Sequence, residues 1–209
     1  MEIPDLFLPV IMAYLMGSIP TAVWIGKGFY NVDIRKHGSG NAGATNTIRV
    51  LGLKAGLPVL LIDVFKGFAA ILIAPVLVSE SVTDHFMAYL LLIVAVAVVL
   101  GHTFPVFAGF KGGKGVATLL GVGFGLFPFA ALTALTIFII VLILTRYVSL
   151  ASITAGMVFP FLVAFLFPPP NWLYYILAVA VAIFLPITHR KNIMRLRNGT
   201  ESKLSFKRK

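Results

Sequence analysis

A short polar stretch, His37–Arg49 (HGSGNAGATNTIR), interrupts a chain that is otherwise mostly apolar. Its glycines permit positive φ angles and a close approach of the backbone to a ligand, and its hydroxyl and amide groups can form hydrogen bonds. Arg35, Lys36 and Arg49 add positive charge at both ends. Small residues, exposed N–H groups and flanking cations suit a phosphate or another compact anion. A solvated linker between two membrane helices is the alternative, but a linker does not need so many hydrogen-bonding groups.

A second glycine-rich segment, Pro105–Gly115, ends in KGGKG just before a long apolar run. Glycines that precede a helix expose backbone N–H groups to an anion, and lysine contributes a point charge. The segment is not a Walker A motif, because Gly115 occupies the position after Lys114 where Ser or Thr is required. A basic turn that touches lipid phosphates is the alternative interpretation.

A third polar segment, HRKNIMRLRNGTE, begins at His189 after the last apolar run. If it is helical, His189 and Asn192 lie on one face, near Arg195. A basic anchor at the membrane surface is the alternative. Such an anchor needs neither Asn192 nor Glu201, so the segment is also a candidate part of a site.

The composition indicates an integral membrane protein, because 59% of the 209 residues are hydrophobic and only 11% are charged, against about 25% charged in soluble domains. We expect an all-α polytopic fold that forms a single domain over residues 1–209. The absence of cysteine excludes disulfides, thiolate zinc sites and a thioester on the enzyme. The net charge of +10 lies at helix ends, which favours anionic lipid headgroups and anionic substrates over nucleic acid.

Apolar runs of ~20 residues predict membrane helices, and the long run Val116–Tyr147 is divided at Pro128 because proline removes a helix donor. With the N-terminus outside, all 17 Lys and Arg fall on or near the cytoplasmic side, as the positive-inside rule requires. The C-terminus is then cytoplasmic, and the three polar segments meet at the cytoplasmic face. The seven predicted transmembrane helices are Leu6–Ile25, Leu57–Val78, Phe86–Phe104, Val116–Phe127, Phe129–Thr145, Ser149–Phe167 and Trp172–Ile187. The predicted connections include a polar loop from Gly28 to Lys54, a turn at Ser79–His85, a PPPN turn at Pro168–Asn171 and a basic tail from His189 to Lys209.

Four isolated polar residues have simpler interpretations. Asp63 and Lys66 lie one turn apart inside a span, where an ion pair that holds the helices together is expected. His102 ends the third span beside the KGGKG segment and is expected to be a hydrogen-bonded interface residue. Ser149 follows a basic residue at a helix start and is interpreted as an N-cap.

Some absences narrow the chemistry. On the inner side only Asp33, Asp63 and Glu201 are acidic, which argues against a carboxylate-bound metal cluster and against the metal site of phosphotransferases that use CDP-alcohols. The His-x4-Asp motif of common glycerolipid acyltransferases and the GxSxG nucleophile elbow are both missing. A site rich in anion binders and poor in bases would orient a phosphorylated substrate, with chemistry driven by proximity and charge stabilisation.

Taken together, these segments resemble the bacterial membrane glycerol-3-phosphate acyltransferases that use acyl phosphate. The resemblance spans nearly the whole chain in order, and Ala42 stands where many members have proline. The matching residues are Gly17-Ser18-Ile19-Pro20, Asp33-Ile34-Arg35, GSGNAGATN with Arg49, Asp63 with Lys66-Gly67, Gly101-His102, KGGKGVAT, and His189, Asn192, Ile193, Arg195, Leu196, Gly199 and Glu201.

The resemblance implies a seven-helix enzyme of the cell inner membrane whose active site faces the cytoplasm. It implies transfer of a fatty acyl group from acyl phosphate to the sn-1 hydroxyl of glycerol-3-phosphate, which gives lysophosphatidic acid and inorganic phosphate in phospholipid biosynthesis. It implies no cofactor and no metal. The implied partners are the two substrates, membrane lipids and, transiently, the soluble enzyme that makes acyl phosphate, with no nucleic acid among them.

The resemblance also implies residue roles: Ser39, Arg49 and Lys111 hold phosphate, His189 and Asn192 position glycerol-3-phosphate, the KGGKG glycines bind acyl phosphate, and Glu201 is structural. The implied catalytic residues are Ser39, Arg49, His189 and Asn192. The implied substrate-binding residues are Ser39, Gly40, Asn41, Thr45, Asn46, Arg49, Lys111, Gly112, Gly113, Lys114, Gly115, Ser149, His189 and Asn192.

Two questions stay open at this point. The acceptor hydroxyl must lose a proton, and either a substrate phosphate or His189 could take it. The competing function is a transporter of a phosphorylated metabolite, which predicts polar residues through the whole membrane. The outer halves of the spans are apolar, which disfavours transport. A lipid-binding scaffold would explain the charge but not three polar segments.

Overall fold

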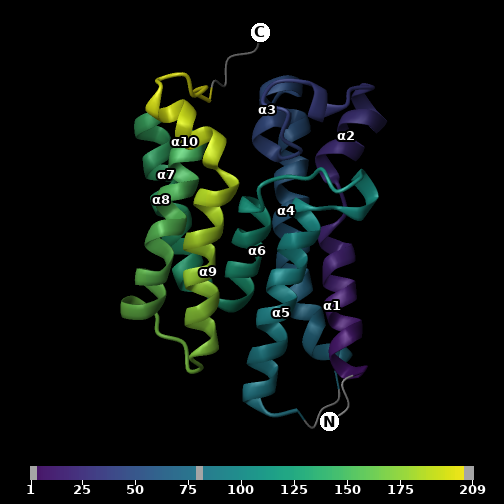
Figure 1. The fold of residues 1–209 in the computed structure, drawn as a ribbon, viewed down its shortest axis with the longest axis vertical. Helices are drawn as coiled ribbons and strands as arrows, with labels where there is room; N and C mark the ends of the chain where they lie inside the picture. Colours follow the sequence, from purple (N-terminus) through teal and green to yellow (C-terminus); the bar gives the residue numbers. More distant parts are fainter. Residues whose placement is uncertain (1–3, 79–81, 205–209) are drawn as a thin grey trace. The chain divides into compact units, whose positions relative to one another are not determined.

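The computed structural model describes residues 4–78 and 82–204, which are helical with connecting turns and contain no strand (Figure 1). These residues form two compact units, divided between Leu126 and Phe127. We call residues 4–126 the first unit and residues 127–204 the second unit. The predicted turn at Ser79–His85 and the predicted basic tail fall partly outside the described residues. The prediction of a single domain stays a prediction.

The first unit is built on helices that approach one another closely. A methyl group at Gly101 of α5 would overlap the carbonyl oxygen of Tyr14 in α1, and one at Gly67 of α4 would overlap that of Thr118 in α6. Glycine therefore lets α1 pack on α5 and α4 on α6 at backbone distance. The helices of this unit are α1 (Pro4–Gly17), α2 (Thr21–Tyr30), α3 (Ala44–Leu51), α4 (Leu53–Ile73), α5 (Asp84–Thr103) and α6 (Val116–Leu126), with short helices η1 (Ile34–Lys36), η2 (Ala74–Leu77) and η3 (Val106–Ala108).

The predicted helix Leu6–Ile25 is wrong as a single continuous element. The structure ends α1 at Gly17 and starts α2 at Thr21, with a bend of 40°. Pro20 has no N–H and disfavours helical geometry in the residue before it. The carbonyl oxygen of Ile19, which the break releases from the helix, accepts a hydrogen bond of 3.0 Å from Lys66 Nζ.

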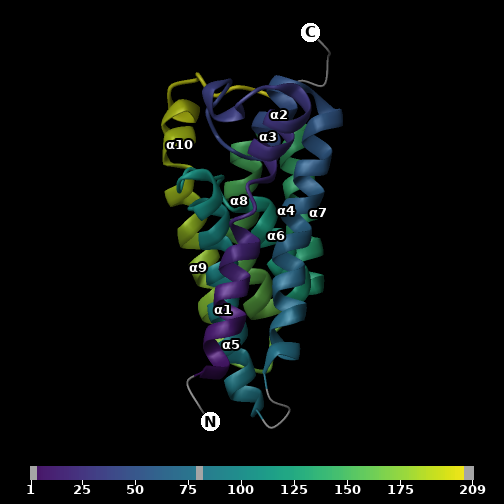
Figure 2. The same ribbon diagram turned by 90° about the vertical axis from the view of Figure 1, so that its right-hand side faces the viewer.

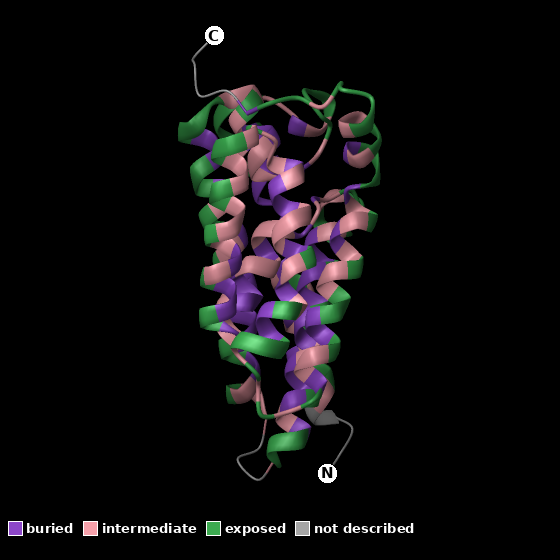
Figure 3. Cartoon of the chain, turned by 90° about the vertical axis from the view of Figure 1, so that its left-hand side faces the viewer, coloured by how far each residue is buried: buried purple, intermediate pink, exposed green. Residues whose placement is uncertain are grey.

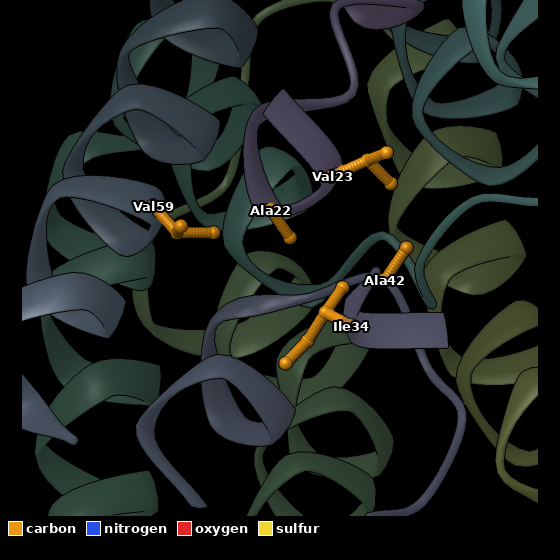
Figure 4. Close-up of a cluster of buried hydrophobic side chains, with 5 residues drawn as sticks. All are labelled: Ala22, Val23, Ile34, Ala42 and Val59. Atoms are coloured by element: carbon orange, nitrogen blue, oxygen red, sulfur yellow. The ribbon is translucent and has the colours of Figure 1, made fainter. Parts of the chain in front are cut away.

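The predicted polar loop Gly28–Lys54 is also more ordered than expected, because it contains α3 and the last turn of α2. Both helices lie at the same end of the first unit in two views (Figure 1, Figure 2). Behind them, a small apolar cluster joins α2, η1, the polar segment and α4 (Figure 4). Its buried members are Ala22, Val23, Ile34, Ala42 and Val59. This cluster gives the polar segment a fixed base, since burial of its apolar groups opposes fraying.

The second unit consists of three long helices and one short helix. The predicted break at Pro128 is confirmed, because α7 begins there, and Pro168–Asn171 lies between helices as predicted. The predicted sixth span follows α8 and then one π-helical turn, η4, just after Pro160. The elements are α7 (Pro128–Thr145), α8 (Val148–Phe161), η4 (Leu162–Leu166), α9 (Leu173–Thr188) and α10 (Arg190–Arg197).

Four helical segments of the described chain are long and apolar enough to cross a membrane, or up to six if each bent pair counts as one span. The four are Leu53–Leu77, Asp84–Ala108, Pro128–Thr145 and Val148–Leu166, and the bent pairs are Leu6–Gly17 with Thr21–Tyr30 and Leu173–Thr188 with Arg190–Arg197. At about 1.5 Å per residue, α6 is too short to cross ~30 Å of hydrocarbon alone. Large apolar side chains such as Phe65, Ile143 and Ile183 are exposed, and burial alternates along individual helices (Figure 3). An integral membrane protein presents such faces to lipid.

Candidate functional site

The first polar segment (residues 37–49) is folded around the side chain of Asn46, which is 1% exposed. Its Nδ2 donates to the carbonyl oxygens of Ile34 and His37, both at 3.0 Å. Its Oδ1 accepts from the backbone N–H of Ser39 at 2.8 Å. Gly38 has a φ of +60°, and a methyl group there would overlap Asn46 Oδ1. All the amide's polar atoms are thus engaged in shaping the segment, and its predicted contact with substrate stays a prediction.

The polar groups that Asn46 supports are presented outward. Ser39, Gly40 and Arg49 are exposed, while Asn41 and Thr45 are half-buried. Arg49 lies in the last turn of α3. This distribution leaves a cation, a hydroxyl group and backbone groups exposed.

Arg35 connects the first polar segment to the second (residues 105–115). Its Nε and one terminal nitrogen donate to the two oxygens of Asp33 at 2.9 and 2.8 Å, and its other terminal nitrogen donates to the carbonyl oxygen of Ala108 at 2.8 Å. The hydrogen bond from the Arg35 side chain is the main reason that the pKa of Asp33 lies well below its ordinary value, and Lys27 at 3.4 Å adds to this effect. The Asp33–Arg35 pair stays ionised at neutral pH and holds the two segments together.

The second polar segment packs directly on the end of α5. The N–H of Gly112 donates to the carbonyl oxygen of Thr103 at 3.2 Å, and that of Gly113 to the carbonyl oxygen of His102 at 3.1 Å. A side chain at either glycine would overlap His102. Lys111 is exposed, Lys114 is half-buried, and Gly115 is buried with a φ of +81°. Gly112 and Gly113 are therefore needed for packing against α5, and Gly115 is needed for its positive φ.

Beneath both segments lies a buried group of charged side chains. The predicted ion pair is confirmed: Lys66 Nζ lies 2.8 Å from Asp63 Oδ1, with both side chains at most 4% exposed. Thr21 Oγ1 donates to the same oxygen at 3.1 Å. His102 is 6% exposed, and its Nδ1 lies 3.6 Å from this oxygen.

In the second unit, the carboxylate of Glu201 gathers three side chains, and we call Ser149, Asn192, Arg195 and Glu201 the Glu201 cluster. Oε1 accepts from Ser149 Oγ at 2.8 Å and from Asn192 Nδ2 at 2.6 Å, and Oε2 accepts from Arg195 Nε at 2.7 Å. Burial would raise the pKa of Glu201, but these hydrogen bonds outweigh it and hold the pKa below its ordinary value of 4.5. The contacts give Glu201 a structural role, which agrees with the resemblance.

The interpretation of Ser149 as an N-cap is wrong. The helix begins one residue earlier, at Val148, and Tyr147 occupies the N-cap position without a side-chain hydrogen bond. Ser149 instead gives its hydroxyl to Glu201, which lies 52 residues later in the chain. A local sequence pattern could not indicate this partner.

The segment after His189 is helical and forms α10. His189 and Asn192 are 3% and 7% exposed. His189 Nδ1 lies 2.8 Å from the carbonyl oxygen of Leu185. A carbonyl can only accept, so Nδ1 carries the proton, and in the neutral ring the lone pair lies on Nε2.

The structure brings the first and second polar segments together within the first unit, and it brings Ser149 to Asn192 within the second. The predicted meeting of all three polar segments stays a prediction. Among residues 4–78 and 82–204, no group of three or more His, Asp or Glu is arranged to hold a metal ion.

Comparisons with known proteins agree on one family. The sequence profile described as glycerol-3-phosphate acyltransferase matches residues 7–199. Proteins of that name from Enterococcus faecalis and Streptococcus equi subsp. equi are 46% and 47% identical to this chain, each covering 94% of it and 91% of its relative. One from Listeria monocytogenes is 42% identical, covering 97% of this chain and 98% of the relative.

Two solved structures are similar throughout. The crystal structure of PlsY (YgiH), an integral membrane glycerol 3-phosphate acyltransferase, in its glycerol 3-phosphate form superposes with a TM-score of 0.84 at 40% identity, covering 96% of each chain. Its lysophosphatidic acid form gives 0.82 at 39% identity, also over 96% of each chain.

Proposed function

This chain belongs to the glycerol-3-phosphate acyltransferase family, and we propose that its acyl donor is acyl phosphate. It is a multi-pass membrane protein, and its reaction is the acylation of glycerol-3-phosphate. The proposed products are lysophosphatidic acid, acylated at the sn-1 hydroxyl, and inorganic phosphate. The observation that supports this donor is the contact between two glycine-rich segments, which have exposed cations at Arg49 and Lys111. Two such segments suit a reaction in which both substrates carry a phosphate group.

The chemistry needs no covalent intermediate on the protein. Acyl phosphate is a mixed anhydride and is already activated. The sn-1 oxygen attacks the acyl carbon, a C–O ester bond forms, and the bond from the acyl carbon to the phosphate oxygen breaks with its electron pair. Inorganic phosphate leaves, and the hydroxyl proton passes to a phosphate oxygen or to His189. The protein's contribution is to orient the substrates and to stabilise charge.

Ligand roles follow from which side chains are accessible. In the first unit, Ser39, Arg49 and Lys111 are proposed to hold phosphate, because each is exposed and can donate to its oxygens. The KGGKG glycines, with Lys114 beside them, are proposed to bind the acyl phosphate. The remaining proposed ligands of this unit are Gly40, Asn41, Thr45 and Asn46.

In the second unit, His189 and Asn192 are proposed to position glycerol-3-phosphate, with Ser149 nearby. Glu201 fixes the amide of Asn192, so the orientation of Asn192 is set before substrate binds. The relative crystallised in glycerol 3-phosphate and lysophosphatidic acid forms supports this acceptor and this product.

His189→Gln separates the two proton acceptors, because glutamine keeps a hydrogen-bonding group but cannot take a proton at neutral pH. If a substrate phosphate takes the proton, this variant keeps most of kcat and its KM for glycerol-3-phosphate rises. If His189 is the base, kcat falls by about 10²-fold or more and the pH–rate profile loses its histidine limb.

The proposed membrane arrangement has seven crossings, an outer N-terminus, and polar segments that face the cytoplasm from the inner membrane. Soluble acyl phosphate synthase would then deliver the donor from that side. The natural absence of cysteine permits single-cysteine labelling. Lys54→Cys should react with an impermeant maleimide only from the cytoplasmic side and His85→Cys only from the outside, and the reverse pattern would contradict the arrangement.

The donor is tested with purified protein in lipid, without any cytosolic protein. Palmitoyl phosphate and glycerol-3-phosphate are supplied, and phosphate and lysophosphatidic acid are measured together. Equal amounts of both products, and no product with palmitoyl-coenzyme A, are expected. Product formed only from palmitoyl-coenzyme A would overturn the proposed donor.

A further inference from the structure

A buried charged cluster, formed by Asp63, Lys66 and His102, lies directly beneath the second polar segment. Asp63 Oδ1 is its centre and faces Lys66 Nζ at 2.8 Å, Thr21 Oγ1 at 3.1 Å and His102 Nδ1 at 3.6 Å. Lys66 Nζ also donates to the carbonyl oxygen of Ile19, in the break between α1 and α2. The cluster thus joins α4, α5 and the start of α2.

The far side of the histidine ring meets the KGGKG sequence. A methyl group at Gly113 would overlap His102 Nε2 and would lie 3.1 Å from the carbonyl oxygen of Ala42. Gly113 is therefore held between the ring from α5 and the backbone of the first polar segment. Ala42 belongs to the buried apolar cluster (Figure 4).

A small cavity marks the same place. It is lined by Thr21, Ala42, Asp63, Lys66, His102 and Gly112, among others. Charged side chains, the break between α1 and α2, and both polar segments therefore border one space. An ion pair that served only to stabilise the position of α4 would require Asp63 and Lys66. It would not require the ring of His102 to pack against Gly113.

We propose that His102, oriented by Asp63 and Lys66, is a positioning residue that sets the place of the KGGKG backbone against the first polar segment. The inference rests on the proposed function, because the segment that His102 positions is the one proposed to bind the acyl donor. It acts through Gly113 and does not touch substrate. Disturbing His102 should accordingly weaken donor binding and leave acceptor binding nearly unchanged.

The test is a double-mutant cycle between His102→Asn and Gly113→Ala in purified protein. An asparagine amide reaches about as far as Nδ1 and keeps a polar group facing Asp63, but it has no atom at the Nε2 position. We expect each single variant to raise the KM for palmitoyl phosphate about tenfold, with the KM for glycerol-3-phosphate changed less than about twofold. In the His102→Asn background, the additional effect of Gly113→Ala should shrink to less than about threefold, since the overlapping atom is gone.

Three results would overturn the inference in an active enzyme. They are an equal penalty for Gly113→Ala in both backgrounds, an equal rise in both KM values, and a fall in thermal stability without any change in KM. His85→Asn, at an exposed position in the first turn of α5, is the matched control and should leave both KM values unchanged. If His102→Asn does not fold, Asp63→Asn replaces it, with the same donor-selective rise expected and the same equal rise as the contrary result. An inactive wild type would instead indicate failure of the proposed function.

Discussion

The two units present the side chains that are proposed to bind substrate in opposite ways. In the first unit, Ser39 and Lys111 are exposed on glycine-rich backbone and Arg49 is exposed on the last turn of α3, and buried residues such as Asn46 hold the first polar segment in place. In the second unit, Ser149 and Asn192 are themselves buried and share one carboxylate.

Because of this difference, a substitution should change substrate binding and folding stability separately in the first unit but together in the second. An exposed side chain on a supported segment can be removed with little cost to folding, so its loss changes affinity alone. A buried group in a shared network cannot be removed without leaving its partners unsatisfied. Variants of the second unit should therefore change stability and activity together.

Glu201→Ala should give the largest effect. It leaves the buried donors of Ser149 and Asn192 without their acceptor and costs roughly 2–6 kcal/mol in unfolding free energy, at about 1–3 kcal/mol for each unsatisfied group. The thermal unfolding temperature in detergent should fall by several degrees, and activity should fall with it. Thr200→Ala, at the exposed neighbouring position, is the control and should change neither. A stable Glu201→Ala protein that has lost only activity would remove the distinction between the units.

Asn46→Ala should make the first unit behave like the second. Two carbonyl oxygens and the N–H of Ser39 lose their partner, at a cost of roughly 2–3 kcal/mol, so unfolding temperature and activity should both fall. Asn41→Ala, a half-buried position in the same segment, is the control for stability and should unfold near the wild-type temperature. An Asn46→Ala variant that unfolds like wild type would show that Asn46 does not hold the segment.

Arg49→Ala should weaken binding without loss of stability. A charged hydrogen bond to phosphate contributes about 1.5–3 kcal/mol, which corresponds to at least tenfold in affinity. Initial rates should show KM raised by that factor, while the unfolding temperature stays unchanged because the side chain is exposed. Lys54→Ala, an exposed cation nearby in sequence, serves as the control. Unchanged KM and kcat would remove Arg49 from the site.

Lowering the pH should give the smallest effect, and it should distinguish the wild type from the variant Glu201→Gln, in which an amide replaces the carboxylate. The pKa of Glu201 is depressed in the folded protein, so its contribution to stability is present above the ordinary value of 4.5 and is lost as pH falls through the lower folded value. Unfolding temperatures measured from about pH 6 downwards should decline less steeply for Glu201→Gln than for wild type. Identical pH profiles would show that the carboxylate does not stabilise the second unit.

The sequence predicts well those features that depend on local chemistry. Pro128 and Pro168–Asn171 end helices because proline cannot continue them, and the spacing of Asp63 and Lys66 predicts their ion pair. The break at Ile19-Pro20 was readable from the same rule, but the apolar run continues across it, so hydropathy predicted one helix. The helix α3 was missed because Thr and Asn have weak helix propensity.

Local sequence patterns do not indicate contacts between residues that lie several turns or more apart in the chain. Asn46 reads as a ligand in sequence, but its amide is committed to backbone groups at Ile34, His37 and Ser39. Ser149 reads as a cap, but its partner lies 52 residues away. Both residues have the expected polarity, and only tertiary structure shows which groups satisfy it.

We propose that acyl transfer is direct, from a donor held on supported glycine-rich backbone, with no acyl-enzyme. A single-turnover experiment with enzyme in excess over palmitoyl phosphate tests it most directly, with phosphate release followed before and after glycerol-3-phosphate is added. If transfer is direct, no burst of phosphate is expected without the acceptor, and phosphate should be released at the rate of lysophosphatidic acid formation once the acceptor is present. A burst that consumes the donor before the acceptor is added, with palmitate bound covalently to the protein, would contradict it.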